Sequence, residues 1–77
     1  MKNATILSTL EAILNFMDAR ASVDIFRQFS DGGQELLRGN KIYNLIADPE
    51  FIGKYGSYKV IGLSVTLVGV IILIEEA

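Results

Sequence analysis

The stretch KVIGLSVTLVGVIILIE, residues 59–75, decides the fold, because no charged residue lies between Lys59 and Glu75. As a helix, the 15 uncharged residues 60–74 would span about 22 Å, shorter than a membrane's hydrocarbon core of about 30 Å. Nine of them are β-branched, which favours strands, and Gly69 divides the run into two strands of ordinary length. We therefore expect residues 58–65 and 70–75 to form an antiparallel hairpin.

The same stretch has an alternative interpretation as a single membrane span over residues 59–75. Lys54 and Lys59 precede the apolar run, Glu75 and Glu76 follow it, and membrane helices tolerate glycine. The length and the β-branched residues favour the hairpin. A small membrane protein anchored by residues 59–75 is therefore the second choice.

The composition excludes several kinds of chemistry. The chain has 77 residues, which suffice for one small domain over residues 1–77, and it contains neither cysteine nor histidine. Disulfides, thiolate metal sites and the usual general base are therefore missing, and the carboxylates have no spacing typical of a metal loop or an acid–base pair. We expect no catalytic residues, no cofactor and no metal, and an enzyme using hydroxyl or carboxylate chemistry is the least favoured class.

Charge and size bear on the expected partners. The net charge is −2 and the seven basic residues are spread singly, whereas nucleic-acid binding requires clustered lysine and arginine. The N-terminal segment lacks the pattern of a signal peptide, so the expected location is the cytoplasm. Because a small domain buries too little surface to be very stable and 51% of the residues are hydrophobic, we expect a homo-oligomer with an unknown protein partner.

The first segment, residues 3–18, is predicted to be an amphipathic helix whose apolar face packs on a sheet. Asn3 can cap it, whereas Ser8 with Glu11 fits a capping box that would begin a shorter helix. The apolar residues recur at helical spacing and are Ile6, Leu7, Leu10, Ile13, Leu14 and Met17.

The next segment, ASVDIFRQF at residues 21–29, has the period of two that is typical of a strand, although Phe26 breaks the pattern. A two-residue turn at residues 32–33 would place Arg27 opposite Arg38, which is a repulsive pair. A three-residue loop at residues 31–33 places Arg27 opposite Leu37 instead, and we expect this second register. The face covered by the helix would then contain Val23, Ile25, Phe29 and Leu37.

Residues 40–54 are predicted to form an irregular crossing with two short helical turns. Ile42, Leu45 and Ile46 have helical spacing, and Asp48-Pro49-Glu50 has the cap, first-turn proline and early acid of a helix. Aromatic residues follow, with Phe51 and Tyr55 expected over the core and Tyr43, Tyr55 and Tyr58 as a candidate aromatic patch.

Together these segments predict an α+β fold, with an N-terminal helix on a small antiparallel sheet or barrel of about four strands. The strands form two hairpins joined by the crossing. The last strand, VIILIE, is apolar on both faces, whereas one helix covers one face. Barrel closure or a second subunit would cover the other. The possible interface residues are Val70, Ile72, Ile74, Tyr55 and Tyr58.

The run VDIFRQFSDGGQELLRGNKIYNLIAD, residues 23–48, followed by KVIGLSVTLVGVIILIE, resembles short uncharacterised proteins from phages and mobile elements of Gram-positive gut bacteria. The likeness lies in the order of strands, acidic-glycine turn and crossing, and it carries no known activity. It implies an accessory role in which the protein binds a host or phage protein. The expected function is therefore that of a small non-catalytic interaction or regulatory module.

Overall fold

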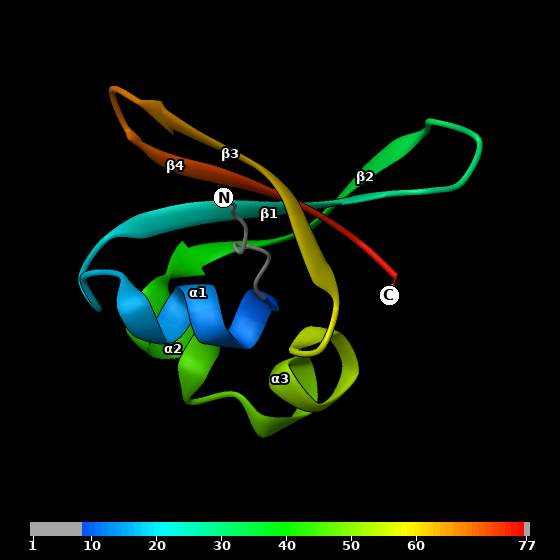
Figure 1. Ribbon diagram of the computed structural model, residues 1–77. Coiled ribbons are helices and arrows are strands. Elements are labelled where there is room, and N and C mark those ends of the chain that lie inside the picture. Colours follow the sequence, from blue (N-terminus) through cyan, green and yellow to red (C-terminus); the bar gives the residue numbers. More distant parts are fainter. Residues whose placement is uncertain (1–8, 77) are drawn as a thin grey trace, which may run out of the picture.

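The computed structural model describes residues 9–76, which form three short helices and four strands (Figure 1). This arrangement confirms the α+β class. The helices are α1 (Leu10–Phe16), α2 (Ile42–Ile46) and α3 (Pro49–Tyr55), and the strands are β1 (Ser22–Gln28), β2 (Gln34–Lys41), β3 (Lys59–Thr66) and β4 (Gly69–Glu75).

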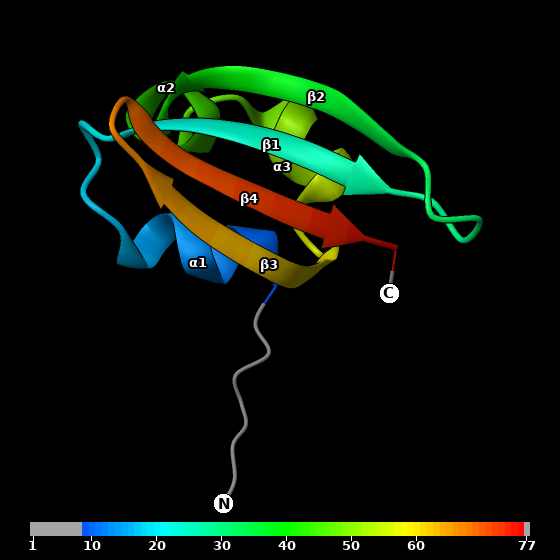
Figure 2. The same cartoon turned by 90° about the horizontal axis from the view of Figure 1, so that it is seen from above.

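The strands form one open sheet in the order β2-β1-β4-β3, with β2 and β3 at the two edges (Figure 2). The hairpins β1–β2 and β3–β4 are antiparallel, as expected. The two hairpins meet through β1 and β4, which run parallel, so the sheet is mixed and is not a barrel. Parallel neighbours need a long connection, and here β2, α2, α3 and β3 supply it.

The helices described lie on one side of the sheet, and the core fills the space between the two layers (Figure 1). Ile25 of β1 lies opposite Ile72 of β4, and both are completely buried. Burial of such aliphatic side chains contributes about 1.5–3 kcal/mol each. The buried hydrophobic residues are Leu10, Leu14, Val23, Ile25, Ile42, Leu45, Phe51, Ile72 and Ile74.

The register expected for the first hairpin is wrong by two residues. The N–H of Phe29 donates to the carbonyl of Gly33 over 2.7 Å, so the loop consists of residues 30–32 and Arg27 lies opposite Glu35. Gly32 has a φ of +93°, which a glycine adopts without strain. A slip of two residues keeps each side chain on its face, so the assignment of faces survives.

The pairing of β1 with β2 also differs from the expected pairing because β2 contains a bulge. Ile25 pairs with Arg38 and Phe26 pairs with Leu36, which leaves Leu37 as the extra residue. Leu37 packs against the core as predicted, together with the buried Val23 and Ile25. Phe29 lies beyond the end of β1 and is 38% exposed, so its predicted place under the helix is wrong.

The described part of the first helix begins later than expected. Thr9 is the N-cap, and its hydroxyl accepts a hydrogen bond of 3.3 Å from the N–H of Ala12. The two caps considered from the sequence, Asn3 and Ser8, lie outside the described residues. Within the described range, the predicted stripe of Leu10, Ile13, Leu14 and Met17 packs against the core as expected.

The crossing and the last hairpin follow the predictions closely. Asp48 caps α3, accepting hydrogen bonds from the N–H groups of Glu50 and Phe51, and Pro49 occupies the first turn. Residues 59–75 form the hairpin β3–β4, which is the stretch that the alternative interpretation assigned to a membrane span. Among residues 9–76, no helix is long and apolar enough to cross a membrane.

The surroundings of Asp48 predict how the stability of the fold depends on pH. The Arg38 guanidinium, 2.9 Å from the carboxylate, together with the N–H of Phe51, lowers the pKa of Asp48. A lowered folded pKa stabilises the fold above the ordinary carboxyl pKa of about 4, and this contribution is lost as the pH falls through the folded value. The melting temperature of the wild type should therefore fall below pH 4 more steeply than that of Asp48→Asn.

Circular dichroism melts between neutral and strongly acidic pH test this expectation. Arg38→Gln serves as the companion variant, since it removes the cation and should flatten the same part of the curve. Parallel curves for the wild type and both variants below pH 4 would show that the Arg38–Asp48 pair does not couple folding to protonation.

Candidate interaction surface

The residues of β4 alternate between the two faces of the sheet, and this alternation separates its isoleucines. Ile72 and Ile74, two of the expected interface residues, are completely buried in the chain's own core, and Val70 packs against that core. Ile71 and Leu73 point to the opposite face and are half-buried. Ile71 and Leu73 are therefore the apolar residues of β4 on the face away from the core.

The two tyrosines expected at an interface lie at the rim of the core. Tyr55 packs between Phe51 and Tyr58, with ring centroids 5.4 and 5.2 Å away respectively. Both tyrosines are partly buried and contact the core cluster, whereas Tyr43 is half exposed on α2. Tyr55 and Tyr58 therefore serve mainly as packing residues at the rim of the core.

The face of the sheet opposite the helices carries an apolar row, and we call it the open face. Phe26 lies at its centre, paired with Leu36 on β2 and with Leu73 on β4. Leu73 in turn pairs with Gly62 of β3, so the row spans three strands and ends beside a glycine on the fourth. Leu36 is 53% exposed and Phe26 and Leu73 are half-buried. In Figure 2 this face is turned towards the viewer, with the helices behind it.

The open face is hollowed beside this row. A shallow depression of about 280 Å³ is lined by Phe26, Gln34, Leu73 and Ile71 and passes over Gly62, Leu63 and Ser64 of β3. Because Gly62 lacks a side chain and Ser64 has a small one, few side-chain atoms cover the backbone of β3 on this face. The depression has the size to receive one or two apolar side chains of a partner.

The charged residues of the open face lie around the apolar row. Lys59 and Glu75 form an ion pair of 3.4 Å at one end of the sheet. Asp24 and Lys41 lie at the other end, where Asp24 alternates with the buried Val23 and Ile25 and Lys41 pairs with Ser22. Acids and bases are thus balanced on this face, and an apolar centre with a polar rim is the usual anatomy of a protein interface.

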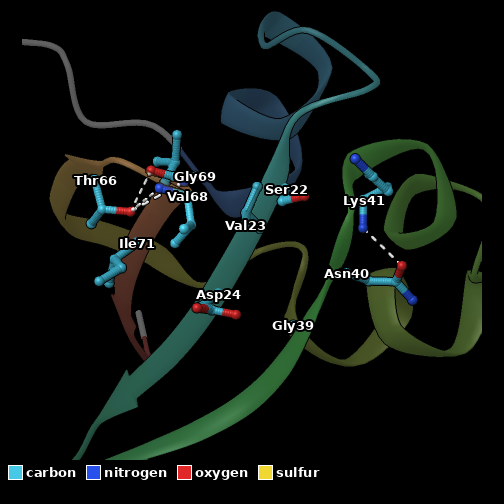
Figure 3. Close-up of a pocket in the computed structure, with 11 residues that line it drawn as sticks. Ser22, Val23, Asp24, Gly39, Asn40, Lys41, Thr66, Val68, Gly69 and Ile71 are labelled. Atoms are coloured by element: carbon cyan, nitrogen blue, oxygen red, sulfur yellow. Dashed lines mark hydrogen bonds between the residues drawn. The ribbon is translucent and has the colours of Figure 1, made fainter.

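A larger hollow of about 480 Å³ lies at the end of the sheet where β1 and β4 begin, and Figure 3 shows its lining. Two of its lining residues, Gly39 and Gly69, have no side chain. Two of its polar side chains serve the local structure. Asn40 Oδ1 accepts from the N–H of Lys41 and from Asn44, and Thr66 Oγ1 accepts from the N–H groups of Val68 and Gly69. These contacts give no reason to assign a ligand.

Arg27 forms a cluster that the sequence did not indicate. Its guanidinium lies over the rings of Phe29 and Tyr58, with distances of 4.7 and 5.4 Å to the centroids. Glu76 is 3.7 Å away, and Nε is buried without a hydrogen-bond partner in the described part of the chain. The cluster covers the end of the core that lies next to Phe29, the residue that follows β1. Stacking on aromatic faces partly compensates for the desolvation of this cation.

Sequence reasoning expected one face of the last strand to lie beyond the cover of the helix but did not locate the apolar row on it, although one signal was present. Phe26 departs from the alternation of β1 because it is an apolar residue on the side where a solvated strand carries polar ones. Leu36 sits in the same way on β2. Two apolar residues at outward positions of paired strands would have located this surface, but the wrong register separated them.

Comparisons with protein families, with characterised proteins and with solved structures find no match to this chain.

Proposed function

We propose that the protein is a non-catalytic interaction module that binds a partner protein through its open face and also self-associates. The observation that carries the proposal is the apolar row Leu36–Phe26–Leu73, which crosses the sheet on the side away from the described helices. An exposed apolar patch with a polar rim is typical of a docking surface. The proposal includes a cytoplasmic setting and, from the resemblance noted above, an accessory role in a phage or mobile element.

The absence of histidine and cysteine from the whole sequence supports the non-catalytic part of the proposal. Residues 9–76 also contain no group of three acidic side chains placed to hold a metal ion. The shape of the open face adds to this argument, because a shallow depression suits the broad contact with a protein surface better than the enclosure of a small molecule.

The test compares proteins captured by immobilised variants from cells that contain the native partner. Leu36→Lys places a charge in the apolar row, and we expect it to reduce capture of the specific partner at least about tenfold, as for a residue at an interface centre. Phe16→Lys is the matched control, since Phe16 is 90% exposed on α1, away from the open face. A partner retained equally by wild type, Leu36→Lys and Phe16→Lys would contradict the assigned surface.

A further inference from the structure

The two edges of the sheet differ in chemistry. The edge strand β2 contains Glu35, Arg38 and Lys41 as well as a bulge, which are common means of preventing strand pairing. The edge strand β3 has no charge between Lys59 and the end of the following turn. An uncharged apolar edge is the one expected to pair with another strand.

Apolar side chains on β3 and its turn are exposed in the described structure. Leu63 is 49% exposed, Val65 is 79% exposed, and Leu67 and Val68 in the turn are almost completely exposed. Figure 1 shows the β3–β4 hairpin rising away from α1 towards this turn, so the helix layer does not reach these residues. A tight turn is usually polar, and solvent alone gives no reason for leucine and valine at its tip.

The segment from Val60 to Val68, VIGLSVTLV, has nearly the same pattern in both directions about Ser64. If the segment is laid antiparallel against a second copy of itself, Leu63 of one copy lies opposite Val65 of the other. The apolar turn residues Leu67 and Val68 then lie beside Ile61 and Val60 of the other copy. No two like charges meet in this arrangement, because the segment contains none.

We infer that two copies of the chain pair through β3, antiparallel and about a two-fold axis near Ser64, to form one continuous sheet. The inference rests on the proposed function, because it names the surface through which the module self-associates. The bulge between Val60 and Gly62 and the bridge from Thr9 to Lys59 occupy the start of β3. The strand-to-strand hydrogen bonds therefore form along residues 62–66. The open faces of the two copies become one continuous surface.

Light scattering coupled to size-exclusion chromatography over about a hundredfold range of concentration tests the inference, since dimerisation follows mass action. The wild type should reach a mass twice the 8.5 kDa of the chain. Leu63→Lys should remain a monomer. Leu36→Lys is the matched control on the other edge, because Leu36 has almost the same exposure, 53%, as Leu63, and it should remain a dimer.

Leu67→Lys is a second variant for the case that Leu63→Lys fails to fold. The Leu67 side chain is fully exposed, so the circular dichroism spectrum of Leu67→Lys should equal that of the wild type. This variant should also remain a monomer. Amide hydrogen exchange should be slow in the wild type and fast in Leu67→Lys at the alternate residues among 62–66 whose N–H groups point away from β4. A wild type that is monomeric at every concentration, polymers that grow without limit, or a dimer broken by Leu36→Lys and not by Leu63→Lys would overturn the inference.

The two proposals fail in distinguishable ways. Loss of partner capture in Leu36→Lys concerns the open face and leaves the mass unchanged. Loss of the dimer in Leu67→Lys concerns the β3 edge, because Leu67 does not line the depression of the open face, and it should leave the specific partner bound, with lower avidity. A monomeric wild type whose partner capture depends on Leu36 would overturn the β3 pairing alone.

Discussion

Ile72→Asp is expected to abolish the folded state at 25 °C. Ile72 is completely buried and lies opposite Ile25 in the centre of the core. The substitution removes an aliphatic side chain, at a cost of about 2–5 kcal/mol, and adds the desolvation of an unpaired carboxylate. The sum is comparable to the whole stability of a small domain, about 5–15 kcal/mol.

Leu73→Asp is the matched control, because Leu73 is the next residue on β4 and points to the open face. We expect it to remain folded with a loss of about 1–2 kcal/mol, since its carboxylate reaches solvent. Chemical denaturation followed by circular dichroism measures both variants. A cooperative transition in Ile72→Asp near that of the wild type would mean that this side of β4 is not the core.

Gly69→Ala is expected to give the second largest loss of stability, about 2–4 kcal/mol. Gly69 begins β4 with a φ of +156°, and a Cβ atom there would collide with the carbonyl oxygen of Ser22. The backbone would have to shift at the point where β1 and β4 begin their parallel pairing.

Gly53→Ala is the control for Gly69→Ala. Gly53 lies within α3, where an added Cβ meets nothing within 4 Å, and alanine has the higher helix propensity. We expect Gly53→Ala to be neutral or to stabilise the protein by up to about 1 kcal/mol. Equal denaturation midpoints for Gly69→Ala and the wild type would contradict the close approach of β1 and β4 at this end of the sheet.

The elements that depend on local chemistry could be predicted from the sequence. The β-branched residues and the length of residues 60–74 indicated a hairpin, and Asp48-Pro49-Glu50 indicated the start of α3. In each case the deciding interactions join residues close together in the chain. The sequence left the open or closed state of the sheet undecided, and its expectation of a wholly antiparallel sheet is wrong, because β1 and β4 run parallel. Both features depend on contacts between distant segments.

The two faces of β4 show why the sequence placed candidate interface residues on the face that the helices cover. Val70, Ile72 and Ile74 alternate with Ile71 and Leu73, and both sets are apolar. The alternation therefore defines two faces without indicating which one the helices cover. That choice depends on the neighbour β1, where Val23 and Ile25 face the core and Phe26 faces outwards. The candidate surface consequently moves from Ile72 and Ile74 to Ile71 and Leu73.

The described helices cover one face of the sheet and leave the apolar row of the other face accessible. Thiol labelling tests this arrangement directly, because the native chain has no cysteine to interfere. Single variants Leu36→Cys, Leu73→Cys and Ile72→Cys would be treated with a thiol reagent under native conditions. We predict ready labelling of Leu36→Cys and Leu73→Cys and strong protection of Ile72→Cys. Equal protection of Leu73→Cys and Ile72→Cys would contradict an open face.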